Sequence, residues 1–326
     1  MRTGRLLYLL IVAVLALAVP PAGAQQPAKI PRIALLGSPS PSSKILHSFK
    51  QGLRELNYIE GQNIILDPRY RADISSLNDV AADLVRHQVD VIVVFTAQPI
   101  LAAMKATKTI PIVMTFVGDA ASEGFVASLE RPGGNITGVS GLTTELGGKW
   151  LELVKETIPS VRRVAVLWNP RSENKFPVWK SVDQAARSLG VDLQWLEVRG
   201  FRREIDRRFR SAIWDRAEAF IVLPGGVFFT GMSEIVELAL RNRLPGISWR
   251  DDFAEAGGLM SYGANRLEQS RRAAYFVDKI LRGAKPAELP VELSRNFELV
   301  INLKTAREIG ITIPPRVLAW ADRVIK

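Results

Sequence analysis

Short apolar runs alternate with longer amphipathic stretches along most of this chain, and this alternation constrains the fold more than any other feature. The runs are rich in β-branched residues, which is typical of strands buried on both faces of a parallel sheet. They lie at residues 32–37, 63–70, 90–95, 110–117, 162–169, 191–198, 219–224 and 245–249. The stretches between them repeat apolar residues with a helical period, as Ile45, Phe49 and Leu53 do. The pattern predicts βαβ units.

The predicted strands outnumber those of a usual single sheet, so we expect two lobes. The halves begin alike: a strand at 33–37 leads through a Ser/Pro loop into a helix, and a strand at 164–169 leads through residues 170–172 into another. Only the architecture repeats, because the two halves show no residue-level similarity. With 326 residues, 47% of them hydrophobic, the chain can build two cores. The predicted fold class is α/β, with two doubly wound parallel-sheet lobes.

The first 24 residues have the order of a secretory signal peptide. Arg2 and Arg5 precede an apolar run at 6–19, and the small residues 22–24 follow it. This run is shorter than the roughly 20 residues that a bilayer span needs, which favours a cleaved signal over a membrane anchor. We therefore predict cleavage after Ala24 and a soluble periplasmic protein.

The mature chain would be basic and free of cysteine. The absence of cysteine excludes disulfides and a lipid anchor on an N-terminal cysteine. A net charge of +10 often indicates a nucleic-acid partner, but export argues against one. The densest basic segment, 201–210, places Phe201, Ile205 and Phe209 four apart, which predicts a helix with a solvated arginine face. Attraction of anionic ligands or of a negatively charged membrane surface is the alternative for that face.

Candidate ligand-binding residues follow the predicted strands. In open parallel sheets, ligands bind beyond the carboxyl ends of strands, where helix N-termini present free N–H groups. This rule selects Ser38, Ser40, Ser42, Thr96, Ala97, Asp119, Asn169, Gly225, Phe229 and Trp249. Hydroxyls and helix N-termini suit a carboxylate, Asp119 suits an ammonium, and the aromatic rings suit an apolar side chain, so the set suits an amino acid. The alternative for each polar residue is an ordinary N-cap.

The sequence lacks the common signatures of catalysis. A G-x-S-x-G elbow, a metal-spaced His or Cys set and a Walker A motif are all absent. His47 and His87 fall in helical stretches beside polar residues and are predicted to lie at the surface. Asp251 and Asp252 are interpreted as capping charges at a helix start rather than as acid or base catalysts. We predict a protein that is not an enzyme and that uses no cofactor and no metal.

Several segments together resemble one known family. They are GLRELNYIEGQNI at 52–64, VASLERPGGNITGVS at 126–140, VAVLWNP at 164–170, LPGGVFF at 223–229, AGGLMSYG at 256–263 and FELVINLKTAREIGITIP at 297–314. They are similar to ABC-transporter substrate-binding proteins, including tryptophan- and phenylalanine-binding members, over nearly all of the mature chain. The resemblance implies a type I periplasmic-binding-protein fold, with two lobes joined by a multi-segment hinge and no chemistry performed on the ligand.

The resemblance also implies how the chain is divided. By analogy with the similarly folded effector domains of lac-repressor-like proteins, the chain crosses at 259–263, and a helix at 265–282 returns to the first lobe. Lobe one is then 25–142 with 264–286, and lobe two is 143–263 with 287–326. The stretch ERPGGNITGVSG at 130–141 is interpreted as a turn and a strand, 136–140, that approach the hinge. Its glycosylation sequon is interpreted as incidental.

For function, the resemblance implies capture of a small molecule between the lobes, with an aromatic amino acid favoured. It implies a monomer that delivers this ligand to an ABC permease in the inner membrane. Two loops depart from the family: Thr96-Ala97-Gln98-Pro99 replaces a common Gly-Thr-Pro, and Pro224-Gly225-Gly226 replaces a Pro-Asp-Pro type of turn. A ligand-sensing module for a membrane receptor and a secreted hydrolase are the alternatives.

Overall fold

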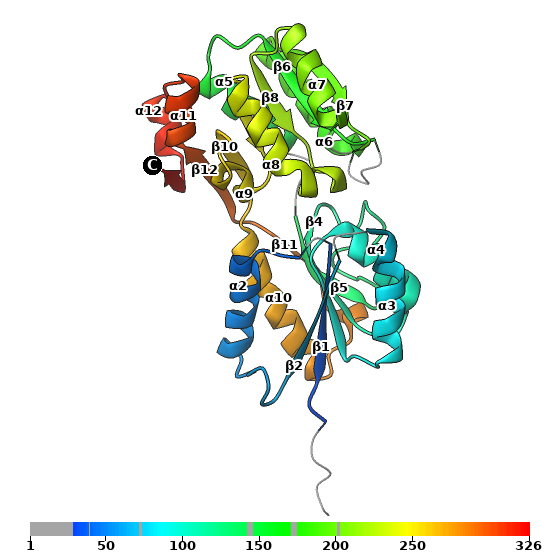
Figure 1. Ribbon diagram of the computed structural model, residues 1–326. Coiled ribbons are helices and arrows are strands. Elements are labelled where there is room, and N and C mark those ends of the chain that lie inside the picture. Colours follow the sequence, from blue (N-terminus) through cyan, green and yellow to red (C-terminus); the bar gives the residue numbers. More distant parts are fainter. Residues whose placement is uncertain (1–28, 39, 72–73, 142–145, 171–174, 201–202) are drawn as a thin grey trace, which may run out of the picture. The chain divides into compact units, whose positions relative to one another are not determined.

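The computed structural model describes residues 29–326 except 39, 72–73, 142–145, 171–174 and 201–202, together with all side chains in these ranges but those of 74, 175–177, 226, 229 and 230. The predicted signal peptide and the predicted lobe boundary after residue 142 therefore lie outside the described residues. Residues 31–326 form one compact unit. This unit contains two sheets, each with its own helices (Figure 1).

The first sheet has the strand order β11-β5-β4-β3-β1-β2. Its members are β1 (Arg32–Gly37), β2 (Ile65–Tyr70), β3 (Val91–Val94), β4 (Ile112–Val117), β5 (Ile136–Ser140) and β11 (Glu292–Leu293). Every neighbouring pair is parallel. Two buried clusters cover its faces, one with α2 (Ser43–Glu55) and α10 (Arg266–Leu281), the other with α3 (Leu77–Arg86) and α4 (Ala97–Ala106). Two short 3-10 turns, Ile74–Ser76 and Pro286–Glu288, complete this part.

The second sheet has the order β13-β12-β10-β9-β8-β6-β7. Its members are β6 (Arg163–Trp168), β7 (Asp192–Glu197), β8 (Ala219–Val222), β9 (Gly246–Ser248), β10 (Met260–Ala264), β12 (Phe297–Asn302) and β13 (Arg323–Ile325). One face carries α5 (Leu146–Thr157), α6 (Lys175–Leu189), α11 (Leu303–Ile309) and α12 (Pro315–Ala319). The other carries α7 (Arg203–Trp214), α8 (Gly226–Arg241) and α9 (Asp251–Glu255).

These elements confirm the predicted α/β class with two sheets. Each of the eight predicted apolar runs contains a strand, and the strand predicted at 136–140 is β5. The second sheet is not wholly parallel, because β12 runs antiparallel to β10. We did not predict β10, β11, β12 or β13 as strands.

Helix α10 packs on α2, far from it in sequence. The Ser270 hydroxyl donates to the Ile45 carbonyl at 2.8 Å. A Cβ at Gly52 would lie 2.6 Å from the Arg271 carbonyl oxygen, so glycine permits the close approach. We predicted that the second segment of lobe one ends at residue 286. The first sheet extends beyond that residue, because β11 pairs with β5.

The stretch at 130–141 is a structural connection. Gly138 has φ 136°, and a Cβ there would lie 2.2 Å from the Met114 carbonyl oxygen, so glycine is required in the middle of β5. The Asn135 amide donates to the Ile110 carbonyl at 2.7 Å. The polar side chain of the sequon therefore ties the start of β5 to the loop before β4.

The basic segment forms α7, in which Ile205 and Phe209 are buried, as the helical period predicted, together with Ala212. Phe201, the first apolar residue of that pattern, lies outside the described residues. Across the described ranges, no helix combines the length and the hydrophobicity needed to span a bilayer.

Candidate functional site

The carboxyl edge of the first sheet brings several predicted site residues close to helix starts. Ser38 follows β1 and is buried, with 9% of its surface exposed. Thr96 is the N-cap residue of α4, and Ala97 is the first residue of that helix. The Thr96 side chain makes no capping hydrogen bond, and its buried Oγ1 has no hydrogen-bonding partner in the described part of the chain. A buried hydroxyl without a partner is costly, so this atom is a candidate ligand contact.

Tyr70, which we did not predict, lies at the same edge. It ends β2 and is the register partner of Gly37, the residue before Ser38. Its buried Oη makes no hydrogen bond to any described residue, and burial raises the pKa of this phenol to about 12. The hydroxyl is thus neutral at physiological pH and can both donate and accept. Its position at the end of a predicted strand was the signal that could have identified it.

Other predicted residues of this edge have local partners. The Ser42 hydroxyl accepts from the Ile45 N–H at 3.4 Å, so Ser42 caps α2. The exposed Ser40 hydroxyl donates to the Pro41 carbonyl at 3.2 Å.

Asp119 follows β4 and also stabilises its own loop. Its Oδ1 accepts from the N–H groups of Ala121, at 3.1 Å, and Ser122, at 3.2 Å. The Ser122 hydroxyl donates to Oδ2. These contacts leave lone pairs on both oxygens, because a carboxylate accepts about four hydrogen bonds.

An aromatic group that we did not predict lies at the ends of β3 and β4. The Phe116 ring lies 6.0 Å from that of Phe95, which lies 6.4 Å from that of Phe49. Phe116 has φ 53°, an uncommon angle for a bulky residue, at a register shift between β4 and β5. Its half-buried ring is covered by the Arg266 guanidinium, 5.0 Å from the ring centroid. Strained backbone often accompanies function, so Phe116 joins the candidates.

The carboxyl edge of the second sheet brings Asn169 and Gly225 together. A Cβ at Gly225 would lie 3.2 Å from the Asn169 Cβ and 3.3 Å from the Phe228 ring. Asn169 follows β6 and is buried, and Gly225 precedes α8. The Phe229 side chain lies outside the described residues. Trp249 follows β9 and packs, half-buried, against the cores on both faces of the sheet.

Buried polar atoms without partners also occur here. The indole Nε1 of Trp168, at the end of β6, and the hydroxyls of Ser248 and Ser261 have no hydrogen-bonding partner among the described residues. Ser248 and Ser261 are register partners on β9 and β10. Both sheets therefore have unsatisfied polar groups at or near the edge where ligands bind in this architecture.

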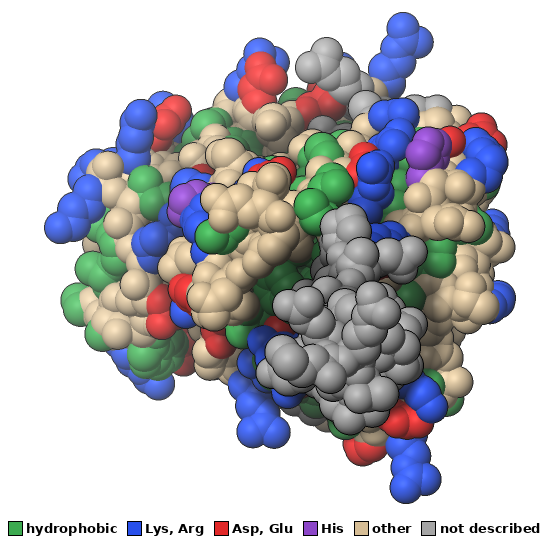
Figure 2. Space-filling view, turned by 90° about the horizontal axis from the view of Figure 1, so that it is seen from below, with side chains coloured by type: hydrophobic (Ala, Val, Ile, Leu, Met, Phe, Trp, Pro, Cys, Tyr) green, Lys and Arg blue, Asp and Glu red, His purple; other side chains and the backbone are tan. Residues whose placement is uncertain are grey.

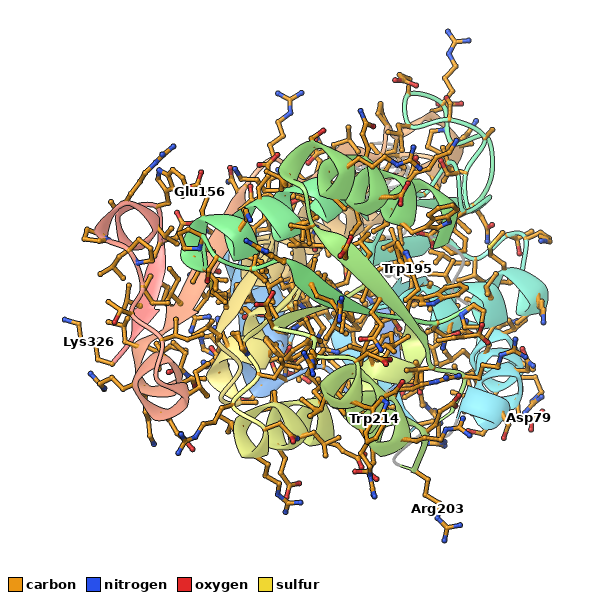
Figure 3. All side chains as sticks on the ribbon, turned by 90° about the horizontal axis from the view of Figure 1, so that it is seen from above. Asp79, Glu156, Trp195, Arg203, Trp214 and Lys326 are labelled. Carbon is orange, nitrogen blue, oxygen red and sulfur yellow. The ribbon has the colours of Figure 1, made fainter. Side chains whose placement is uncertain are left out.

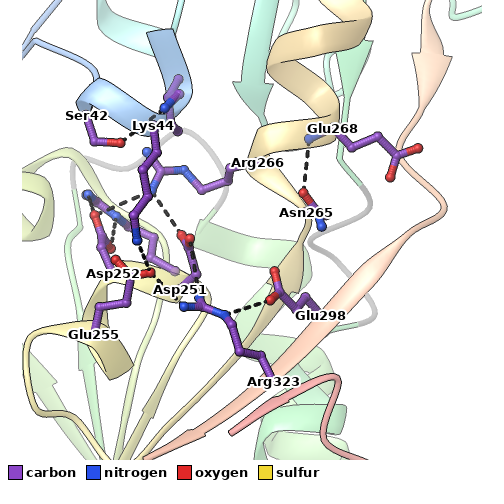
Figure 4. Close-up of polar contacts among 12 residues, drawn as sticks. Ser42, Lys44, Asp251, Asp252, Glu255, Asn265, Arg266, Glu268, Glu298 and Arg323 are labelled. Carbon is purple, nitrogen blue, oxygen red and sulfur yellow. Dashed lines mark hydrogen bonds and ion pairs between the residues drawn. The ribbon is translucent and has the colours of Figure 1, made fainter. Parts of the chain in front are cut away.

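Charged residues connect α9 to the start of α10 (Figure 4). Asp252 accepts from the buried Arg250 guanidinium, at 2.8 Å from Nε. The Arg266 Nη1 lies 3.2 Å from the Asp251 carboxylate and 3.4 Å from that of Asp252. Burial raises the pKa of the Asp252 carboxyl, but the Arg250 and Arg266 guanidinium groups outweigh it and hold that pKa below its ordinary value. The acidic pair thus forms ion pairs as well as the first turn of α9, where we predicted capping charges.

A second group of ion pairs joins helices of the two sheets. The Lys44 ammonium, from α2, lies 2.9 Å from the Glu255 carboxylate, from α9. Arg323 Nη1 lies 2.7 Å from the same carboxylate. Figure 4 shows these contacts around α9.

Within the described ranges, no group of three or more His, Cys, Asp or Glu side chains is arranged to hold a metal. His47 and His87 are exposed, as predicted, and Figure 2 shows histidine at the surface. A crevice of about 720 Å³ lies between α10 and residues 290–296, and none of the predicted site residues lines it.

A sequence comparison identifies the family. The family described as ABC transporter substrate binding protein matches residues 33–325. The chain belongs to this family.

Three individual proteins are similar to this chain over most of its length. A tyrosine-binding protein from Clostridioides difficile (strain R20291) is 26% identical to this substrate-binding protein over 269 residues, 82% of this chain and 77% of the relative. The structure of an ABC domain in complex with L-Trp from Streptococcus pneumonia is 26% identical, with a TM-score of 0.83, and the match covers 90% of this chain and 99% of that one. A conserved domain protein from Vibrio cholerae has 26% identity and a TM-score of 0.82, over 91% of this chain and all of that one (100%).

Proposed function

We propose that this substrate-binding protein captures an amino acid, with an aromatic one favoured, between its two lobes. The observation that carries the proposal is the set of buried polar atoms at the carboxyl edges that find no partner among the described residues, Thr96 Oγ1 foremost. The tyrosine-binding and L-Trp-bound relatives support the ligand class. We propose the lobes expected from the sequence, 25–142 with 264–286 and 143–263 with 287–326, except that β11 is moved from the second lobe to the first because it pairs with β5.

In this proposal the ligand carboxylate binds at the start of α4. The Thr96 hydroxyl and the N–H of Ala97 donate to it, because the first N–H groups of a helix lack partners within the helix. Ser38 and Tyr70 contribute further hydroxyls from the neighbouring strands. Asp119 receives the ammonium with the lone pairs that its own loop leaves.

The ligand side chain would be held by rings and by the second lobe. Phe116 packs against one face of the ligand ring, and Trp249 closes over it. Asn169 and Gly225 supply polar contacts. Closure is favoured only as far as the ligand binds the closed form more tightly than the open one.

We further propose that the chain is exported, cleaved after Ala24 and active as a monomer in the periplasm. The closed form would deliver the unchanged amino acid to an ABC permease in the inner membrane. The order of charged, apolar and small residues at the N-terminus supports export.

A thermal-shift series tests the ligand class. The purified chain is heated with tryptophan, phenylalanine, tyrosine, alanine, glutamate or glucose. A ligand at 100 times its dissociation constant should stabilise the protein by about 2.7 kcal/mol. We expect the aromatic amino acids to raise the melting temperature most and to be recovered unchanged by mass spectrometry. A shift with glucose alone, or conversion of the bound amino acid, would refute the proposal.

A further inference from the structure

The surface of α7 carries a stripe that the proposed ligand site does not use. Arg203, Arg207, Arg210 and Trp214 are spaced by four, three and four residues, so they share one side of the helix. All four are exposed, and the apolar residues of α7 in the core lie on the opposite side. We call these four residues the α7 stripe. Figure 3 labels its two end residues on the same side of the molecule.

Trp214 is the most unusual member of the α7 stripe. It is 87% exposed, and the neighbouring Ile213 is 39% exposed. Leaving a tryptophan and an isoleucine in water forgoes the gain from burying them, so an exposed apolar pair on an otherwise charged surface marks a candidate contact. Tryptophan prefers the interface between lipid and water, where its ring is buried and its N–H stays hydrated.

The charges around Trp214 favour an anionic partner. Residues 203–216 contain five arginines and three acidic residues. Arg207 lies 3.7 Å from Glu204, and Arg210 pairs with Asp206, but both arginines are largely exposed, at 70% and 80% of the side chain. Such exposed pairs are weak and can exchange for phosphate contacts. Arg203 has no ion pair within the described residues.

We propose that the α7 stripe is a docking surface for an anionic phospholipid membrane. Three arginines would contact lipid phosphates while Trp214 and Ile213 enter the interfacial region. A second copy of this chain fits less well, because both copies stay basic: the full chain has a net charge of +10, and cleavage after Ala24 removes only the charges of Arg2 and Arg5. The surface would hold the protein near the membrane that contains its permease.

Vesicle sedimentation tests this surface directly. The probes are vesicles of equal parts phosphatidylglycerol and phosphatidylcholine, compared with phosphatidylcholine alone. The chain from residue 25 is used, since residues 31–326 form one compact unit and the apolar run at 6–19 would itself enter lipid. We expect binding to the anionic vesicles, weakening as salt is raised, and none to the neutral ones.

Matched variants assign the binding to the α7 stripe. Trp214→Ser and Arg210→Gln should each reduce vesicle affinity about fivefold or more. Two control variants should leave vesicle affinity unchanged. Trp320→Ser changes another exposed tryptophan. Arg187→Gln changes an arginine whose side chain is 81% exposed and which pairs with Asp183, four residues earlier, as Arg210 pairs with Asp206. All four should keep the thermal shift given by the amino-acid ligand, so failure here is separate from failure of the ligand proposal.

Two outcomes would overturn the membrane proposal. One is the absence of binding to anionic vesicles at low salt, which would leave a solvated face or a protein contact. The other is equal loss in the control variants, which would show that only the overall charge attracts the vesicles.

Discussion

Replacing Thr96 with valine distinguishes a ligand contact from a structural hydroxyl. The Thr96 Oγ1 is buried and has no partner among the described residues, so the ligand-free fold gains little from it. A hydroxyl that caps or braces the fold contributes about 1 kcal/mol, whereas a buried one without a partner costs about 1–3 kcal/mol. Thr96→Val should therefore leave the free energy of unfolding of the ligand-free protein unchanged or raise it by up to about 1 kcal/mol.

Ligand affinity, by contrast, should fall in Thr96→Val. A hydrogen bond to a charged carboxylate contributes about 1.5–3 kcal/mol, so its loss should raise the dissociation constant roughly 10- to 150-fold. Isothermal titration calorimetry with the amino acid that gives the largest thermal shift measures the dissociation constant. Urea unfolding without ligand measures the stability.

Thr157→Val is the matched control. The Thr157 hydroxyl is buried and donates to the Leu153 carbonyl at 2.7 Å. Its loss should lower stability by about 1 kcal/mol and leave the dissociation constant unchanged. The reasoning would be refuted if Thr96→Val lowered the free energy of unfolding as much as Thr157→Val does and kept full ligand affinity.

Three further predictions follow from single residues. Gly138→Ala should lower the free energy of unfolding by about 3 kcal/mol or more, because its Cβ would lie 2.2 Å from the Met114 carbonyl oxygen at a φ of 136°. Gly134→Ala is the control, since a Cβ at Gly134 would have no atom within 4 Å, and it should leave the free energy of unfolding nearly unchanged. Urea unfolding measures both. Tyr70 ionises near pH 10.0 when unfolded and at about 12 when folded, so stability should fall as the pH rises through this window. The fall should be smaller in Tyr70→Phe, and an equal fall in thermal melts would contradict the assignment. Asp252 has a folded pKa below its ordinary 3.8, so its carboxylate stabilises the protein above that pH and the contribution is lost as the pH falls. Asp252→Asn should therefore be less stable than the unchanged protein at neutral pH and should lose less of its free energy of unfolding when the pH falls below 3.8. Urea unfolding at neutral pH and at a pH below 3.8 would measure this difference.

The sequence predicted strands β1 to β9 and the main helices because their signals are local. The β-branched run at 32–37 became β1 with the same bounds, and the helical period predicted the buried Ile205 and Phe209 of α7. The rule of carboxyl edges also selected Thr96, whose hydroxyl is buried and has no partner in the described ranges of the chain. Periodicity and chain order are sufficient for such inferences.

The sequence did not reveal contacts that depend on distant segments. Nothing local distinguishes Phe116 from other apolar residues at strand ends, and its φ of 53° follows from the register shift against β5. Arg266 covers that ring only because α10 returns to the first sheet.

The sequence by itself determined the alternation of β1 to β9 with helices and the buried faces of α2 and α7, because residue spacing encodes them. The edge at which a ligand binds stays a prediction from strand order. The tertiary structure decided that β11 joins the first sheet and that β12 runs antiparallel in the second. It also decided which hydroxyls stay unsatisfied, separating Thr96 from Ser42. The physical reason is that a strand's neighbours and a buried atom's partners come from segments far away in the chain, which no local pattern specifies.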